Sequence, residues 1–407
     1  MFKTKQQMTN IFFLCCAYSE TQQALFLKES KRGYQYAAQN FQFSLIDGFL
    51  KNPSATLNVL SIPSLSTYPK GCAIAKVKDS PFVFEDKIIG ESYGFFNIPF
   101  FNHKYQRRVD KYIDDWYAAS SDTKTIIVYA MLKQQMLYAV EAKRRHPDIR
   151  LCLIIPDLPM YMACNKYYKL LGMQKHDIKV IESLLHLFDY YVVLAEPMVN
   201  KLRIQDKPHV VIEGIYSEMK SSSEKHPKFA KKTIMYAGGI VSRYGVFDLI
   251  EAFHRIKNEE VRLLLCGPCP EMEKLNGYLN SDKRIEYRGL VSTTEVRKLQ
   301  QQVTLLVNPR HSTEDFTKYS FPSKTLEYMA SGTPVLMSNL PSMPNEYKGY
   351  LYLFDDETID GMRSRIEEVL SFDIHLLSIK GDQAKDYILK FKNSRSQTRK
   401  IIDLIEK

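Results

Sequence analysis

The amino-acid sequence predicts an α/β protein with two doubly wound domains, each built around a parallel sheet. Three observations indicate this class. Short runs of Val, Ile and Leu alternate with amphipathic helical patterns, a polar stretch interrupts the alternation, and a second series of similar size follows. Runs that are apolar throughout are typical of strands buried on both faces, as in parallel sheets. With 407 residues, the chain is long enough for two domains with separate cores.

The first series, residues 1–216, predicts an N-terminal Rossmann-like domain. Its strands are expected at residues 11–16, 57–62, 125–130, 150–155, 190–195 and 209–214, with helices between them such as 134–145 and 177–188. The stretch "SEMKSSSEKHPKFAKK", residues 217–232, is polar, charged and rich in turn formers, which indicates a linker.

The second series, residues 233–385, predicts a C-terminal Rossmann-like domain. Strands are expected at 233–237, 261–266, 284–289, 303–308, 334–338 and 350–354, with helices at 247–257, 293–302 and 323–331. A basic helical pattern at 386–407 ends the chain and is expected to pack back on the N-terminal domain. Ligands of open α/β sheets bind beyond the carboxyl ends of the strands, so we expect the two domains to face a ligand-binding cleft.

Composition and charge narrow the class of partner. The chain is 45% hydrophobic and 25% charged, as in soluble globular proteins, and its net charge is +10 with a pI of about 9.0. A basic surface favours a nucleotide, a nucleic acid or an acidic membrane as partner, or it reflects solvated faces only. Nucleic acid is not expected, because the basic-aromatic motifs of RNA modules and any recognisable reader fold are missing. No apolar run approaches the ~20 residues of a membrane span.

Metal and redox chemistry are not expected. The seven cysteines show no framework spacing, which fits buried thiols in a reducing cytoplasm. Cys266 and Cys269 form one C-x-x-C, but a zinc site needs four ligands and no second pair lies nearby. The sequence also lacks the dinucleotide and Walker A fingerprints, the D-x-D spacing, H-E-x-x-H and G-x-S-x-G.

The stretch "KYSFPSKTLEYMASGTPVLMS", residues 318–338, predicts a turn, a helix and a strand. Pro322 suits the start of a helix and Gly332 suits its end. The free N–H groups of the first turn attract an anion, and Ser323 and Lys324 add a hydroxyl and an ammonium there. Glu327, four residues past Ser323, is placed to accept hydrogen bonds from ribose hydroxyls. The alternative is a solvated Lys324 and a Glu327 that caps or pairs.

Several segments together resemble the retaining glycosyltransferases of family 4, which have the GT-B fold. They are "MYAGGIVSRYGVFDLIEAFHRI" (235–256), "LLLCGP" (263–268), "YRGLV" (287–291), "LLVNPR" (305–310) and "FPSKTLEYMASGTPVL" (321–336). The N-terminal half resembles the acceptor domain by its strand-helix rhythm, and "IIPDLPMYM" (154–162) is similar to transferases of bacterial surface polysaccharides. The resemblance implies transfer of a sugar from a nucleotide-diphosphate donor such as a UDP-sugar, with retained configuration and without metal or cofactor.

The sequence departs from the family pattern at three places. Of two glutamates that the family spaces eight residues apart, the second matches Glu327 and the first is replaced by Tyr319. A family Arg and Lys in the loop after the first strand are replaced by Gly239 and Tyr244. Arg243 is the natural substitute for these charges, with Lys324 on the other side of the diphosphate. Glu314 and Asp315 lie upstream and are alternatives for a sugar-side acid.

The resemblance implies the following site. The expected catalytic residues are Arg243, Lys324 and Asp157, and the expected donor-binding residues are Gly238, Gly239, Gly289, Leu290, Asn308, Arg310, Tyr319, Ser320, Ser323, Lys324 and Glu327. Gly238 and Gly239 would let the backbone approach the phosphates. Gly289 to Val291 would line the base. For Asn308 and Arg310, a structural turn with a surface Arg is the alternative.

The acceptor is expected on the first domain. Asp157 ends a strand within "PDLP", where it would orient an acceptor hydroxyl or cap the next helix. The aromatic and basic stretch 93–108 would seat a lipid-linked acceptor at an anionic membrane, or it packs in the core. We therefore expect a cytoplasmic enzyme, either free or peripheral at the inner face of the membrane, that acts on a glycan or a lipid-linked saccharide.

The missing sugar-side glutamate is also consistent with a second class of protein, one without catalytic activity. In this alternative the chain is a non-catalytic GT-B partner subunit that binds glycan or activates a true transferase. The retained "FPSK" and Glu327 argue against it, because a protein that binds no nucleotide has no need of a nucleotide cradle. Titration with nucleoside diphosphates separates the two hypotheses.

Overall fold

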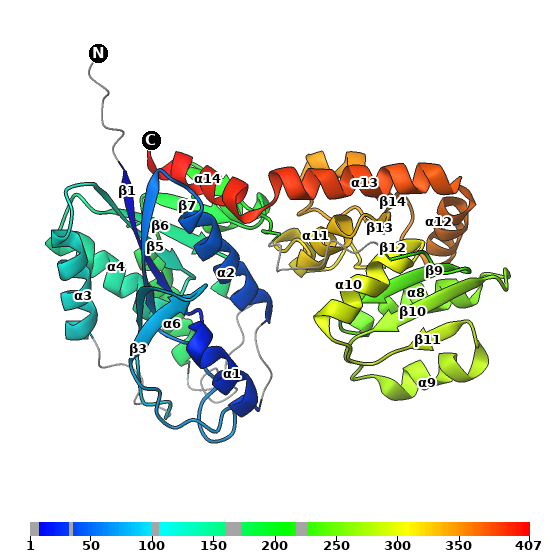
Figure 1. The fold of residues 1–407 in the computed structure, drawn as a ribbon, viewed down its shortest axis with the longest axis horizontal. Coiled ribbons are helices and arrows are strands. Elements are labelled where there is room, and N and C mark those ends of the chain that lie inside the picture. The colour runs from blue at the N-terminus through cyan, green and yellow to red at the C-terminus, as the bar shows by residue number, and fades with distance from the viewer. Residues whose placement is uncertain (1–7, 32–35, 99–105, 160–171, 217–225) are drawn as a thin grey trace, which may run out of the picture. The chain divides into compact units, whose positions relative to one another are not determined.

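The computed structural model describes residues 8–31, 36–98, 106–159, 172–216 and 226–407 (Figure 1). The chain divides into two compact units, one of Met1–Ile215 together with Ser394–Lys407 and one of Tyr216–Asn393. Each unit has a mainly or wholly parallel sheet with helices on both faces. The α/β architecture predicted from the alternating pattern is therefore confirmed. Residues 217–225 of the expected linker lie outside the described residues.

The first unit is built on an eight-stranded sheet with the order β3-β4-β2-β1-β5-β6-β7-β8. Its strands are parallel except β3, which runs antiparallel to β4. The strands are β1 (Thr9–Cys15), β2 (Ala55–Ser61), β3 (Ser80–Phe84), β4 (Lys87–Ser92), β5 (Thr123–Tyr129), β6 (Arg150–Ile155), β7 (Tyr190–Val193) and β8 (His209–Val211). The sequence did not predict β3 and β4, because these two strands at one end of the sheet lack the continuous apolar run of the inner strands.

Helices cover both faces of the first sheet. Figure 1 shows α2 (Tyr36–Leu50) and α14 (Ser394–Ile405) on one side and α3 (Gln106–Ala118) and α4 (Lys133–Arg145) on the other. Side chains of β1 alternate accordingly. Phe13 stacks edge-on against Phe49 of α2, whereas the Phe12 ring lies 5.1 Å from the Trp116 ring of α3. The remaining helices of this unit in the described residues are α1 (Glu20–Glu29), α6 (Met173–Leu185) and α7 (Pro197–Leu202).

The second unit has a six-stranded, wholly parallel sheet with the order β11-β10-β9-β12-β13-β14. Its strands are β9 (Lys232–Ala237), β10 (Val261–Cys266), β11 (Ile285–Tyr287), β12 (Leu305–Asn308), β13 (Val335–Ser338) and β14 (Tyr352–Phe354). The helices are α8 (Val246–His254), α9 (Met272–Ser281), α10 (Thr293–Gln302), α11 (Ser323–Ala330), α12 (Ile359–Ser371) and α13 (Ile374–Phe391), with short 3-10 turns η2 (Ser242–Tyr244), η3 (Asp315–Lys318) and η4 (Asn345–Tyr350).

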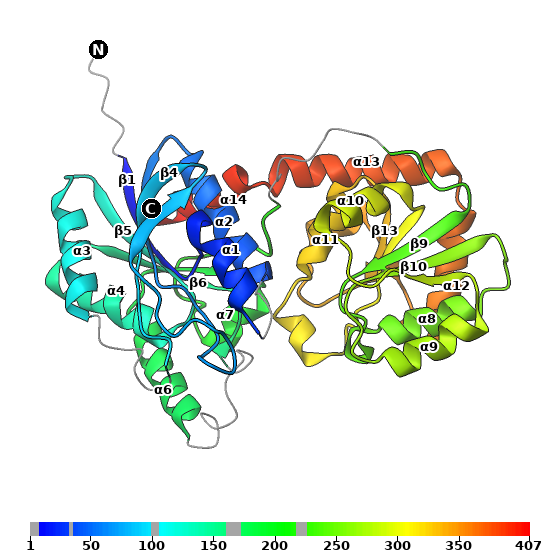
Figure 2. The ribbon, with the colours of Figure 1, turned by 60° about the horizontal axis from the view of Figure 1, so that its bottom comes forward.

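Successive side chains of β9 point to opposite faces of the sheet, so they contribute to two separate parts of the core of this unit. Ile234 and Tyr236 pack with α8, α9 and α12, and Met235 packs with α10, α11 and α13. Figure 2 shows α8 and α9 on one side of the sheet and α10 and α11 on the other. All strands end at one edge because the sheet is parallel, so the loops after β9, β10, β11 and β12 gather there. The candidate donor residues lie in these loops and in α11.

The end of the chain differs from the single helical pattern expected at 386–407. Residues 386–391 complete α13 in the second unit, and α14 is a separate helix in the first unit. Ile401, Ile402 and Ile405 of α14 are fully buried in the core of that unit. Asn52 donates a hydrogen bond of 2.8 Å to Thr398, and Ser394 donates one to Asp47. The chain therefore leaves the first unit at residue 215 and returns to complete it.

Candidate functional site

Helix α11 is fixed against the carboxyl ends of two neighbouring strands. The buried Tyr328 hydroxyl accepts from the N–H of Ala237, at 2.7 Å, and donates to the carbonyl of the same residue, at 3.1 Å. Asn308, the last residue of β12, donates from its amide to Thr325 at 3.3 Å. These bonds place the first turn of α11, which begins after Pro322, at the edge where β9 and β12 end.

Lys324 of α11 lies over the end of β9. Its Nζ is 3.1 Å from the Tyr236 hydroxyl, which in turn donates to the carbonyl of Gly239 at 3.0 Å. A Cβ at Gly238 would lie 1.8 Å from this Nζ, so a side chain there would displace the lysine. Burial lowers the pKa of Lys324 to about 8, and the positive charge of Arg310 adds to the lowering. The ammonium is therefore held where its charge is costly.

Arg310 follows β12 by two residues and is clamped by aromatic rings. Its guanidinium carbon lies 5.1 Å from the ring centroid of Tyr244 and 5.1 Å from that of Phe316. Burial lowers the pKa of Arg310. Within the described ranges of the chain, no carboxylate forms an ion pair with Lys324 or Arg310 within 4.0 Å.

Arg243, expected to be catalytic, has different surroundings. It lies in η2 with its side chain 62% exposed, and its Nε is 3.6 Å from a carboxylate oxygen of Glu314. Its guanidinium carbon is 4.5 Å from the ring centroid of Phe316. Arg243 therefore borders the same aromatic residue as Arg310 but already has an acidic partner. Asp315, the other alternative acid, pairs with Lys318 at 3.0 Å.

Glu327 lies one turn after Ser323 on α11 and is exposed to water. Burial nevertheless raises the pKa of its carboxyl, while the charges of Arg297 and Lys324 partly oppose this. Protein atoms surround the carboxyl group, while part of the side chain reaches water. Glu327 is thus an accessible carboxylate in crowded surroundings, where a ligand hydroxyl could reach it.

The other predicted donor residues lie on the loops at this edge or just behind it. Gly289 and Leu290 follow β11, where Leu290 is 79% exposed, and the N–H of Gly267 donates to the carbonyl of Gly289 at 2.7 Å. Ser323 is the exposed first residue of α11, and the carbonyl of Ser320 accepts from Ser342. Tyr319 directly follows η3.

Asn308 differs from these loop residues because it is 3% exposed and donates to Thr325. Its amide therefore holds α11 in place, and the expected contact of Asn308 with the donor stays a prediction. The structure accounts for this position of the amide, since Asn308 is the last residue of β12 and points into the sheet–helix packing.

Asp157 belongs to the first unit and follows β6 by two residues. It is exposed to water, yet burial raises the pKa of its carboxyl. Burial raises the pKa of Tyr129, at the end of β5, and the negative charge of Asp157 adds to this effect. Residues 160–162 of the motif that contains Asp157, and residues 99–105 of the aromatic and basic stretch, lie outside the described residues.

Three site residues were not singled out from the sequence: Tyr236, Phe316 and Tyr328. Tyr236 and Tyr328 join β9 to α11 through hydroxyl groups, and Phe316 contacts both arginines. An aromatic side chain in the polar loop at 311–320 was a usable signal for Phe316. Tyr236 and Tyr328 fit the strand and helix patterns as core residues. The sequence pattern therefore did not predict the hydrogen bonds of their hydroxyl groups.

The side chains and helices of the described part of the chain also bear on metal binding and on membrane insertion. No group of three or more His, Cys, Asp or Glu side chains there could hold a metal ion. None of the helices described is both long and apolar enough to cross a membrane. Cys266 of the C-x-x-C pair is buried, and burial raises the pKa of its thiol to about 11.

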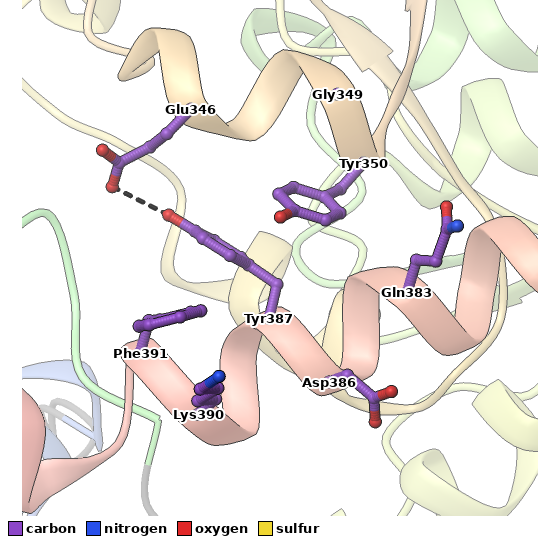
Figure 3. Close-up of a pocket in the computed structure, with 8 residues that line it drawn as sticks. All are labelled: Glu346, Gly349, Tyr350, Gln383, Asp386, Tyr387, Lys390 and Phe391. Atoms are coloured by element: carbon purple, nitrogen blue, oxygen red, sulfur yellow. Dashed lines mark hydrogen bonds between the residues drawn. The ribbon is translucent and has the colours of Figure 1, made fainter.

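A separate hollow of about 590 Å³ lies between η4 and α13 (Figure 3). Tyr350 and Tyr387 stack there with ring centroids 4.4 Å apart, and the Tyr387 hydroxyl donates to Glu346 at 2.8 Å. Tyr350 lies just before the start of β14, whereas Arg310 follows the end of β12. Since the sheet is parallel, the two lie at opposite edges, and the hollow is distinct from the site around Lys324.

Comparison with known proteins identifies the fold. Residues 231–371 match the family model described as glycosyl transferases group 1. Among solved structures, the chain is similar to sucrose-phosphate synthase from Thermosynechococcus elongatus, with 13% identity, a TM-score of 0.62 and 98% of each chain covered. It is similar to HepE of Anabaena in complex with UDP, with 11% identity, a TM-score of 0.63 and coverage of 98% of this chain and 99% of that one.

A third similar structure is the lipopolysaccharide outer core galactosyltransferase WaaB, with 15% identity, a TM-score of 0.60 and coverage of 98% and 99%. No curated protein is significantly similar to the chain in sequence. At these identities the structural likeness establishes the fold alone, and the chain has the GT-B fold that was predicted.

Proposed function

We propose that this protein is a glycosyltransferase that moves a sugar from a nucleoside-diphosphate donor, a UDP-sugar in the first instance, to a glycan or lipid-linked saccharide. The main support is geometric: two cations without acidic partners among the described residues, Lys324 and Arg310, lie beside the first turn of α11. This turn is in a domain that matches the group 1 glycosyl transferase model. Solved structures of HepE, similar in fold, contain UDP and UDP-glucose.

Each part of the donor has a matching group at this edge. The amides of the first turn of α11 and the ammonium of Lys324 bind the diphosphate. Gly238 allows the lysine to cross the loop after β9, because any Cβ there would collide with Nζ. Glu327 accepts hydrogen bonds from the ribose hydroxyls, and the loop from Gly289 to Val291, in which Leu290 is exposed, borders the base.

The proposed site catalyses the transfer by stabilising the negative charge that develops on the leaving diphosphate. When the bond between the sugar and the diphosphate breaks, negative charge grows on the departing oxygen. Cations and amide dipoles that are already fixed there stabilise this charge without reorganising. Lys324 and Arg243 supply the cations of this proposal, and the sugar is transferred with retained anomeric configuration and without a metal. The anomeric configuration of the product, read by NMR, tests the stereochemical part.

The acceptor is assigned to the first unit, where Asp157 orients its hydroxyl. This unit carries 31 Lys and Arg against 22 Asp and Glu, whereas the second unit carries 25 against 24. Almost all the excess positive charge therefore belongs to the first unit, which suits an anionic, lipid-linked acceptor at the cytoplasmic face of a membrane. Co-sedimentation with vesicles of anionic and of neutral lipid tests this contact, and equal binding to both would oppose it.

The direct experiment titrates UDP, ADP, GDP and TDP calorimetrically and then scores turnover of the matching nucleotide sugars by released diphosphate. We expect saturable binding of at least one nucleoside diphosphate. Glu327→Ala should weaken that binding about ten- to hundred-fold, the value of hydrogen bonds to a charged group, and leave inorganic pyrophosphate binding unchanged. Glu260→Ala, which removes an exposed carboxylate paired with Lys231, is the matched control.

The outcomes separate the two function classes. No saturable binding of any nucleoside diphosphate would favour a non-catalytic partner subunit. Equal effects of Glu327→Ala and Glu260→Ala would remove the ribose role from Glu327.

A further inference from the structure

Arg310 is a cation in need of a counter-ion. Its guanidinium is half-buried, burial lowers its pKa, and the positive charge of Arg243 lowers it further. The acidic residues of the described segments leave it unpaired, as stated above. A charge held away from water costs free energy unless an opposite charge compensates for it. The site is therefore suited to an anionic ligand.

The clamp around Arg310 fixes its position. Tyr244 belongs to η2 and Phe316 to η3. The centroids of their two rings are 6.3 Å apart, and the ring planes meet at 65°. Both rings contact the guanidinium, so cation–π attraction limits its rotamers. The underlying loops are also tightly packed, because a Cβ at Gly245 would lie 2.1 Å from the carbonyl oxygen of Pro309. Arg310 is thus pre-positioned, unlike an ordinary surface arginine.

Arg310 and Lys324 act on the same region. Their strands and helix meet where β9 and β12 end, and the charge of Arg310 lowers the pKa of Lys324. Gly239 and Tyr244 hold the positions of the two cations in the family pattern, and the Tyr244 ring supports Arg310 instead. Arg243 differs from Arg310 in having an acidic partner, because its Nε lies 3.6 Å from a carboxylate oxygen of Glu314.

We propose that Arg310, held between Tyr244 and Phe316, is a catalytic residue that binds the donor diphosphate together with Lys324. This inference rests on the proposed function. The bond between the anomeric carbon and the phosphate oxygen breaks, and its electron pair stays on that oxygen beside the guanidinium. The sugar passes to the acceptor oxygen, whose proton leaves with the diphosphate. Arg243 has a secondary role in the same site.

The test titrates UDP, or whichever nucleoside diphosphate the protein binds best, and the corresponding monophosphate. The variants are Arg310→Gln, Arg310→Lys, Arg243→Gln and Lys324→Gln, with Arg255→Gln, directly after α8, as the matched loss of an exposed arginine. Arg310→Gln should weaken diphosphate binding about ten- to hundred-fold and monophosphate binding much less, since the lost contact is to the diphosphate. Arg310→Lys should keep part of the affinity, and Arg243→Gln should cost less than Arg310→Gln.

Thermal unfolding provides the second readout. Removal of an uncompensated charge should leave the melting temperature of Arg310→Gln equal to or above that of the wild type. A lower melting temperature with equal losses for diphosphate and monophosphate would show a structural role and overturn the inference. The inference would also be overturned if Arg310→Gln bound the diphosphate as tightly as the control Arg255→Gln.

The proposed function and this inference fail in different ways. If Lys324→Gln loses diphosphate binding and Arg310→Gln does not, the role of Arg310 alone is wrong. If the wild type binds no nucleoside diphosphate, both fall together.

Discussion

The buried positive charge of Lys324 destabilises the free protein, and a bound anion would compensate for it. The ammonium contacts the Tyr236 hydroxyl and has no ion pair within the described residues, and its pKa is lowered to about 8. A bound diphosphate would restore the charged state that burial opposes. The same side chain therefore couples ligand binding to pH, and it links the stability of the domain to its function.

Lys324→Met should stabilise the protein and abolish diphosphate binding. A lysine whose folded pKa lies below its ordinary value destabilises the fold at pH values below the folded pKa, and this penalty disappears as the pH rises toward the ordinary value. With a folded pKa of about 8, the variant should be more stable at pH 7 by about 3 kcal/mol, and the difference should shrink between pH 8 and pH 10.5.

Denaturant unfolding of the two proteins across this pH range checks the prediction. Wild-type affinity for the diphosphate should also fall as the pH rises above 8. A variant that is less stable than the wild type at pH 7, or a wild type with pH-independent affinity, would contradict this account of Lys324.

At the residue scale, the sequence predicted the groups that local spacing defines. Ser323, Lys324 and Glu327 share one helix, so their relation followed from helical geometry. The clamp on Arg310 was not predictable in this way, because Tyr244 and Phe316 come from loops about 70 residues apart in the sequence. Such contacts depend on strand order, which the sequence pattern alone leaves open.

At the scale of elements, α11 and the sheet act as one unit. Tyr328 satisfies both backbone groups of Ala237, and Asn308 holds Thr325, so the helix start is fixed to the ends of β9 and β12. The sequence predicted this helix at 323–331, and the structure has it at Ser323–Ala330. The start agreed because Pro322 and Gly332 mark the limits of the helix by backbone chemistry. The hairpin of β3 and β4 was missed because both strands carry mixed polar and apolar side chains.

Tyr328→Phe should loosen this connection. The variant leaves the N–H and C=O of Ala237 without their partner, which costs about 1–3 kcal/mol of unfolding free energy. Nucleoside diphosphate affinity should fall as well, since the first turn of α11 is no longer fixed. Tyr352→Phe on β14 is the control, because its hydroxyl makes no hydrogen bond within the described residues. Equal stability and affinity of the two variants would show that the Tyr328 hydroxyl is dispensable.

At the scale of the whole molecule, the first unit is completed by the last helix of the chain. Three isoleucines of α14 are fully buried in its core, and a Cβ at Gly48 of α2 would lie 2.3 Å from the carbonyl oxygen of Ser394. Each buried isoleucine contributes about 1.5–3 kcal/mol, so the helix is comparable with the total stability of a domain. The sequence predicted that this segment would return to the first domain, although its boundary lies in the break between α13 and α14.

A chain that ends at Asn393 should therefore lose the cooperative unfolding of the first unit and keep nucleotide binding by the second. Removal of Lys407 alone is the control, since this exposed residue lies beyond α14. Calorimetric scans with and without UDP distinguish the two units, because only the second should be stabilised by the ligand. An unchanged transition of the first unit would contradict the structural role of α14.

The most direct test of the central claim is an experimental structure of the protein with a bound nucleoside diphosphate. We predict the diphosphate on Lys324, Arg310 and the first turn of α11, with the ribose on Glu327. A nucleotide in the hollow beside Tyr350 and Tyr387, or anywhere else away from the carboxyl ends of β9 and β12, would contradict it.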